Sequence, residues 1–216
     1  MQIEPDKYRA VVFDLDGTLY DNKGLPMRLI LSDIPNMFVL GAERKARRML
    51  SGKDYGDAAG VYDTLFATMA AVKSRLTVEK ARRWYQDKYM PMQVTLLYMY
   101  YEPRPLAAEL LQAIKARGLK CYLYSDYGHE VEKVTALGLD KDLFDGIVSA
   151  AKMGGLKPSR PSMERMQQLF GLDAETTLYV GDREDTDGES ARAVGMPFVN
   201  VKASPEAWDE LLKAFL

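Results

Sequence analysis

The stretch Ala10-Val11-Val12-Phe13-Asp14-Leu15-Asp16-Gly17-Thr18-Leu19 decides the fold. Residues 10–14 form a short, largely apolar run, which suits a buried parallel strand. Asp14 and Asp16 stand at its carboxyl end, where open α/β sheets bind their ligands. Gly17 permits a sharp bend there. Because two close carboxylates repel each other, a divalent metal or a proton held by one of them would relieve the repulsion.

After residue 106, one pattern of helical stretches and short apolar runs repeats along the chain. Helical stretches end at a glycine, and a short apolar run follows within a few residues. These runs are Lys120–Tyr124, Gly146–Val148, Thr177–Val180 and Pro197–Val201. The β-α-β-α rhythm predicts an α/β fold, a doubly wound parallel sheet in which residues 10–14 form the first strand.

Residues 21–101 lack this alternation of helical stretches and apolar runs. Helical patterns at 43–50, 61–72 and 77–88 follow one another with no convincing strand between them. The sequence therefore predicts an α/β core of residues 1–20 plus 102–216, interrupted by an all-helical insertion of residues 21–101. The insertion carries 13 Lys and Arg against 8 Asp and Glu, a net charge of +5, and the remainder carries −7. This division favours a cleft that receives an anion beside an acidic cation site.

Composition narrows the class of partner. The 216 residues carry a net charge of −2. Because the chain has no overall excess of positive charge, we expect no nucleic-acid partner. No apolar run is long enough to span a bilayer, so we expect no membrane partner. The single cysteine, Cys121, cannot form an intramolecular disulfide, which favours a cytoplasmic location. The sequence sets no expectation for the oligomeric state.

Four motifs, taken together, resemble the haloacid dehalogenase superfamily of phosphatases and phosphotransferases. Asp-Leu-Asp-Gly-Thr-Leu after an apolar strand is similar to the first motif of that family. The other three are a strand that ends in Ser125, the pair Lys157-Pro158 ahead of a helix, and the run Gly181 to Asp187 after an apolar strand. All four occur in the family's order, and they cover the chain outside residues 21–101. The resemblance implies a helical cap, of the family's C1 type, inserted after the first strand.

The resemblance also implies a role for each matched residue. Asp14 is the expected nucleophile, which becomes an aspartyl-phosphate, and Asp16 is the expected acid and base. Ser125 and Lys157 are expected to bind the phosphoryl group. The expected Mg²⁺ ligands are Asp14, the carbonyl of Asp16 and Asp182, with Asp187 supporting the metal.

Four places in the sequence leave alternatives open. Asp185 competes with Asp187 as the supporting carboxylate. The run after Lys157 has one residue more before its second proline than the family commonly shows, which leaves Arg160 as a possible second cation. Asp126 stands where asparagine is frequent in the family, and the alternatives are that it contacts the substrate or contacts nothing. The basic run at 44–48 is interpreted as a solvated helix face, with contact to an anionic substrate as the alternative.

The function that follows is a Mg²⁺-dependent phosphomonoester hydrolase acting on a small phosphorylated metabolite. A phosphomutase of the same superfamily is the alternative with the same chemistry, because both would use Asp14 and Asp16. A regulatory module without activity is the alternative of another class. The complete set of matched residues argues against it.

Overall fold

The structure of the protein is a computed structural model that describes residues 3–216. At its centre lies a parallel five-stranded sheet with the strand order β3-β2-β1-β4-β5. The strands are β1 (Ala10–Phe13), β2 (Lys120–Ser125), β3 (Gly146–Ser149), β4 (Thr177–Gly181) and β5 (Phe198–Asn200). The expected doubly wound parallel sheet is confirmed, and the bounds of each strand lie within one residue of the expected run.

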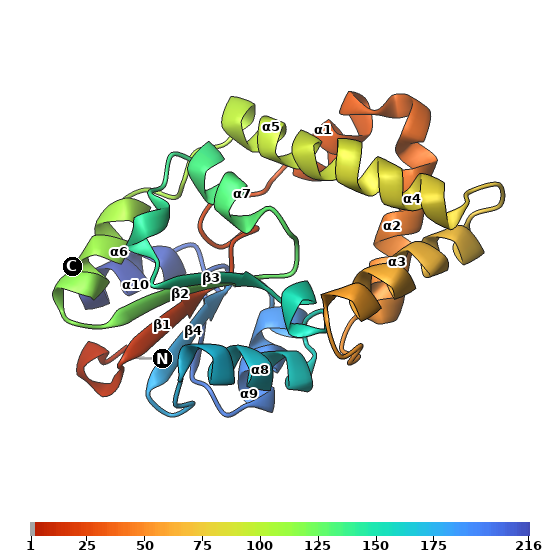
Figure 1. Cartoon of the computed structure of the whole chain (residues 1–216). Helices are drawn as coiled ribbons and strands as arrows, with labels where there is room; N and C mark the ends of the chain where they lie inside the picture. Colours follow the sequence, from red (N-terminus) through yellow and green to blue (C-terminus); the bar gives the residue numbers. More distant parts are fainter. Residues whose placement is uncertain (1–2) are drawn as a thin grey trace.

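Helices cover both faces of this sheet (Figure 1). One face carries α6 (Ala107–Ala116), α7 (Glu130–Ala136) and α10 (Ala207–Phe215), and the other carries α8 (Arg160–Phe170) and α9 (Glu189–Ala193). Successive side chains of a strand point to opposite faces. Val11 and Phe13 of β1 therefore pack beneath the first set of helices, and Val12 packs against the second.

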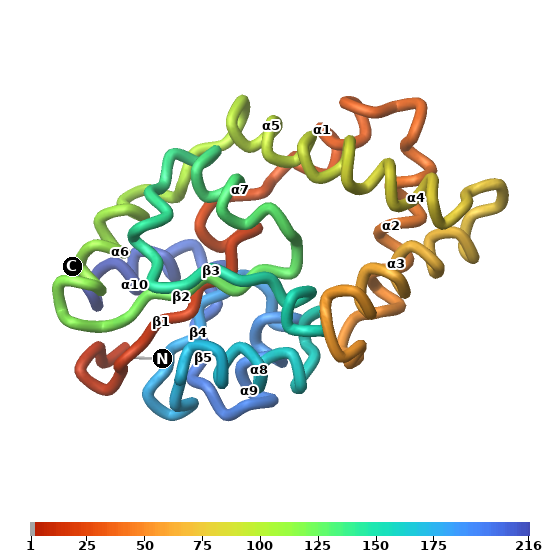
Figure 2. The backbone as a smooth tube through the Cα atoms, viewed as in Figure 1, coloured from red at the N-terminus to blue at the C-terminus, as the bar shows by residue number. Residues whose placement is uncertain are grey.

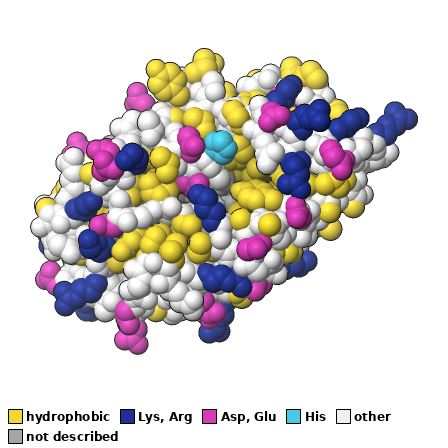
Figure 3. Space-filling view, in the orientation of Figure 1, with side chains coloured by type: hydrophobic (Ala, Val, Ile, Leu, Met, Phe, Trp, Pro, Cys, Tyr) yellow, Lys and Arg dark blue, Asp and Glu magenta, His cyan; other side chains and the backbone are white. Residues whose placement is uncertain are grey.

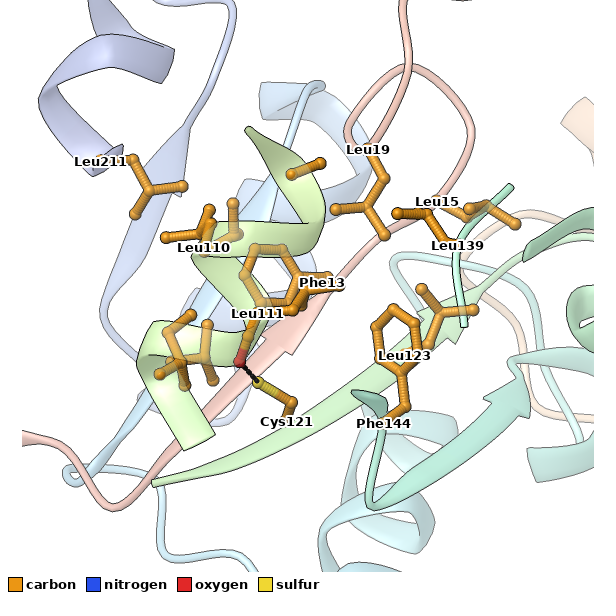
Figure 4. Packing of buried hydrophobic residues seen from close by; sticks show 14 of the residues in the cluster. Phe13, Leu15, Leu19, Leu110, Leu111, Cys121, Leu123, Leu139, Phe144 and Leu211 are labelled. Carbon is orange, nitrogen blue, oxygen red and sulfur yellow. Dashed lines mark hydrogen bonds between the residues drawn. The ribbon is translucent and has the colours of Figure 1, made fainter. Parts of the chain in front are cut away.

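The first face holds the larger part of the core (Figure 4). Phe13 and Leu123, from adjacent strands, pack there against Leu110 and Leu111 of α6. Each fully buried side chain of this kind contributes about 1.5–3 kcal/mol through removal of apolar surface from water. Cys121 lies in the same layer, where burial raises the pKa of its thiol to about 12.

The segment between β1 and α6 is helical, and residues 21–101 are called the helical insertion below. Its helices are α1 (Leu25–Ser32), α2 (Met37–Leu50), α3 (Ala58–Val72), α4 (Val78–Trp84) and α5 (Met90–Tyr100). They pack around a second apolar cluster, to which Ala151 and Leu156 of the sheet domain also belong. Lys and Arg side chains gather over this part of the molecule, on the right in Figure 3. The domain boundaries at 20/21 and 101/102 stay a prediction.

The helical insertion packs against the sheet domain along several elements, and Figure 2 shows the path of the chain between the two. Where the chain enters and leaves it, the guanidinium of Arg104 donates to the carbonyls of Thr18, at 2.8 Å, and Gly17, at 3.1 Å. At its far end, the Ser51 hydroxyl donates to the Lys157 carbonyl at 2.6 Å. Two backbone bonds join the same loops, from Gly52 to Leu156 at 3.1 Å and from Tyr55 to Gly154 at 2.7 Å.

No helix within residues 3–216 combines the length and the apolar character needed to cross a bilayer.

Candidate active site

The six residues predicted from the motifs line one small pocket, of about 50 Å³, at the carboxyl edge of the sheet. The end of β1 supplies two of them, and β2, the loop before α8, the end of β4 and the π-helical turn Glu184–Gly188 supply one each. They are Asp14, Asp16, Ser125, Lys157, Asp182 and Asp187. Parallel strands bring these distant residues together because their carboxyl ends share one edge.

Lys157 is the central cation of this pocket. Its ammonium, with a side chain only 3% exposed, lies 2.6 Å from Asp14 Oδ1 and 2.6 Å from Asp187 Oδ1. Burial alone disfavours the charged lysine, but these two carboxylates hold its pKa well above the ordinary value. The Thr18 hydroxyl donates to the second oxygen of Asp14 at 2.9 Å. The orientation of Asp14 is therefore set on both of its oxygens.

Three carboxylates of the pocket fit a divalent cation. Asp14, Asp182 and Asp187 each offer one oxygen, and these oxygens lie within 4.8 Å of one another. Burial and the neighbouring carboxylates raise the pKa of Asp14, and burial raises that of Asp182. A hard dication would favour the ionised forms, and Mg²⁺ prefers such oxygen ligands. Asp185 is paired with Arg183 at 2.7 Å on the surface, so Asp187 is the residue that belongs to the cluster.

Gly17 is required by the close approach of this cluster. It has φ of +103°, a conformation that side-chain-bearing residues rarely adopt. A Cβ at this position would lie 2.2 Å from Asp182 Oδ2. The same carboxylate oxygen accepts a hydrogen bond from Lys202 at 2.8 Å. The turn after β1 therefore brings the backbone next to Asp182 without a steric clash.

Asp16 has partners that the sequence did not indicate. Lys133 of α7, whose side chain is fully buried, donates to its two oxygens at 2.9 and 3.2 Å, and the Tyr20 hydroxyl donates at 2.6 Å. Ser125 Oγ lies 3.4 Å away. Burial would raise the pKa of Asp16, but Lys133 and Tyr20 outweigh it and hold that pKa below the ordinary value. No sequence pattern marked Lys133, because hydrophobic periodicity treats a lysine inside a helix as exposed.

The structure around Lys157 shows what Asp126 and Arg160 contact. Lys157 and Pro158 are joined by a cis peptide bond. Asp126 Oδ1 accepts a hydrogen bond from the Lys157 amide at 2.8 Å, so this aspartate holds the backbone of the lysine. The interpretation of Arg160 as a second cation of the site is wrong. It points outward, where its side chain is 68% exposed and pairs with Glu164 at 2.8 Å.

The helical insertion also reaches the pocket wall through Arg47. The interpretation of residues 44–48 as a solvated face is wrong for this residue, which is buried and ion-paired with Glu43. Its guanidinium donates to the Asp126 carbonyl at 3.4 Å and lies 3.9 Å from the centre of the Tyr127 ring. Arg47 therefore joins α2 to the loop that follows β2.

A family model described as haloacid dehalogenase-like hydrolase matches residues 8–195 of the chain. A glyceraldehyde 3-phosphate phosphatase of Methanocaldococcus jannaschii is 28% identical over 89% of this chain and 84% of its own. A phosphoglycolate phosphatase of Aquifex aeolicus is 27% identical over 87% of this chain and 81% of its own.

Solved structures share the fold at lower identity. CbbY from Rhodobacter sphaeroides, in complex with phosphate, is 20% identical with a TM-score of 0.62, over 88% of this chain and 84% of its own. L-2-haloacid dehalogenase from Xanthobacter autotrophicus is 20% identical with a TM-score of 0.58, over 97% of this chain and 84% of its own.

Proposed function

Because the chain belongs to the haloacid dehalogenase-like hydrolases and is a phosphatase, we propose that it hydrolyses the phosphate monoester of a small metabolite with Mg²⁺ as cofactor. The observation that carries the proposal is the buried carboxylate of Asp14, held 2.6 Å from Lys157 beside Asp182 and Asp187. In the proposed reaction, this arrangement would supply a nucleophile, a cation for the phosphoryl oxygens and a cation site in one pocket.

In the first step of the proposed reaction, a carboxylate oxygen of Asp14 attacks phosphorus and the bond from phosphorus to the ester oxygen breaks. Asp16 transfers a proton to the leaving oxygen, which departs as an alcohol. Lys133 makes Asp16 a stronger acid once it is protonated, because its positive charge favours the carboxylate that remains. The covalent product is a phosphoryl group on Asp14.

In the second step, Asp16 accepts a proton from water as the water oxygen attacks the same phosphorus. The bond between phosphorus and Asp14 breaks, which releases inorganic phosphate and restores both carboxyl groups. Throughout, Lys157 and the Ser125 hydroxyl would hold the phosphoryl oxygens. Mg²⁺ held by Asp14, Asp182 and the Asp16 carbonyl, with Asp187 in support, would neutralise charge on these oxygens.

Release of phosphate from phenyl phosphate and from a panel of small phosphorylated metabolites, with Mg²⁺ and with EDTA, tests this function. We expect Asp14→Asn to lower kcat/KM by at least about 1000-fold, because it removes the nucleophile. Asp142→Asn is the matched control, since Asp142 is an exposed carboxylate paired with Lys141 that lines neither pocket and should leave the rate unchanged. Full activity in Asp14→Asn, or activity in EDTA, would overturn the proposal.

A cytoplasmic location belongs to the same proposal. Its support is the single cysteine of the sequence, Cys121, which is buried and carries no disulfide.

A further inference from the structure

A second, larger cavity adjoins the pocket of the carboxylates. It has a volume of about 350 Å³ and lies between α2 of the helical insertion and the loops of the sheet domain. The two spaces share five lining residues, which are Asp126, Tyr127, Lys157, Arg183 and Thr186. Because the smaller pocket has room for little more than a phosphoryl group, the rest of a substrate would have to occupy the larger cavity.

Three arginines of α2 line this cavity, and two of them have no carboxylate partner. Arg47 is neutralised by Glu43. Arg44 and Arg48 make no ion pair within residues 3–216, and they lie four residues apart, on one face of the helix. One nitrogen of Arg44 donates to the Pro26 carbonyl at 3.4 Å, which leaves its other N–H groups available.

The opposite wall does not neutralise these two cations. Its one carboxylate, Asp126, accepts a hydrogen bond from the Lys157 amide at 2.8 Å, and Arg183 adds a further guanidinium, itself paired with Asp185. The cavity therefore carries an excess of positive charge beyond what the transferring phosphoryl group uses. Guanidinium groups bind carboxylates and phosphates through paired hydrogen bonds.

We propose that the leaving group of the substrate carries a second anionic group, a carboxylate or a phosphate, and that Arg44 and Arg48 bind it. The inference rests on the proposed phosphatase function and adds the class of substrate. It selects phosphomonoesters with two separated anions over those whose leaving group is neutral. The distance between the anions is set by the path from Lys157 across the cavity to α2.

The test compares short-chain phosphomonoesters with and without a second anion, assayed with Mg²⁺. Propyl phosphate has none, 2-phosphoglycolate and 3-phosphooxypropanoate carry a carboxylate, and 1,3-propanediol bisphosphate carries a phosphate. We expect higher kcat/KM for at least one anionic probe in the wild type. In the double variant Arg44→Gln/Arg48→Gln, the ratio of anionic to neutral kcat/KM should fall about 10-fold to 100-fold.

Lys45→Gln is the matched control, because Lys45 is an exposed cation of the same helix that does not line the cavity. It should leave the ratio unchanged. A wild type that hydrolyses propyl phosphate without preference for any anionic probe would overturn this inference alone, as would an unchanged ratio in the double variant. Absence of hydrolysis for every probe and for phenyl phosphate would overturn the proposed function with it. The probe with the largest loss identifies the anion as carboxylate or phosphate.

Discussion

Lys133 is a fully buried cation whose main partner is the carboxylate of Asp16, 2.9 Å away. Its positive charge holds the pKa of Asp16 below the ordinary value. Lys133→Met removes that charge, so the pKa of Asp16 must rise. We expect the limb of the kcat/KM profile that follows Asp16 ionisation to move up by about 1 to 3 pH units, the range for loss of a nearby opposite charge. A pH profile measured with phenyl phosphate checks this.

Lys152→Met is the matched control for that profile. Lys152 pairs with Glu130 at 3.6 Å, and its side chain is 57% exposed. It does not touch Asp16, so its loss should leave the limb in place. A Lys133→Met profile that only drops in height, without moving along the pH axis, would show that Lys133 supports the fold rather than the acidity of Asp16.

The residues of the pocket and those that contact them divide into residues that the sequence could predict and residues that it could not. Asp14 and Asp182 directly follow apolar strands and Ser125 ends one, so the sheet topology alone places them at one edge. Lys133 lies inside a helix, and hydrophobic periodicity treats a lysine there as exposed. Only the tertiary contact with Asp16 explains its burial.

At the scale of elements, α3 begins with a side-chain hydrogen bond that can be removed cleanly. Asp57 Oδ1 accepts from the Gly60 amide at 2.8 Å and satisfies one of the unpaired N–H groups of the first turn. We expect Asp57→Ala to lower the free energy of unfolding by about 1 kcal/mol. Urea unfolding followed by circular dichroism measures this.

Asp63→Ala provides the contrast within the same helix. Asp63 pairs with Arg82 at 2.7 Å, but its side chain is 67% exposed, and surface ion pairs contribute about 0–1 kcal/mol. The loss should therefore be smaller than for Asp57→Ala. Equal losses in the two variants would contradict the role given to Asp57.

Elements of the sheet were predictable to one residue, and those of the helical insertion were not. The buried parallel strands are nearly continuous apolar runs, which gives them sharp ends. The expected helix at 43–50 instead begins at Met37, because the exposed Met37 and Phe38 do not follow an amphipathic pattern. The expected helix at 77–88 passes through a π-helical turn, Tyr85–Tyr89, directly into α5.

At the scale of the whole molecule, the far end of the helical insertion is fixed to the loop that carries Lys157. The amides of Gly52 and Tyr55 donate to carbonyls of that loop at 3.1 and 2.7 Å. We expect Mg²⁺ with beryllium fluoride, a mimic of a phosphoryl group on Asp14, to slow hydrogen exchange of both amides. The reason is that a ligand held by Lys157 orders the acceptor loop and lowers the population of open states.

Exchange measured by mass spectrometry on peptides covering 50–57 and 153–158 gives the readout. The peptide covering α10, on the outer side of the sheet domain, serves as the internal reference and should not change. Unchanged exchange in 50–57, with beryllium fluoride bound, would contradict a link between this contact and the site.

The position of the helical insertion in the chain can be predicted, because only helical patterns follow the first strand. Its contacts with the sheet domain do not follow from any sequence pattern. Ser51 and Gly52 meet the Lys157 loop mainly through backbone carbonyls. The backbone bonds among them depend on the path of the chain and not on residue type.

The hydrogen bonds from Arg104 to the turn after β1 have a consequence for the evolution of proteins with this fold. Its bonds to Gly17 and Thr18 close the sheet domain at the point where the chain leaves and re-enters it. The carboxylates that we propose to react all belong to the sheet domain. Descendants of one ancestor can therefore exchange or rebuild the intervening helices, and acquire new substrates, while the chemistry is inherited unchanged.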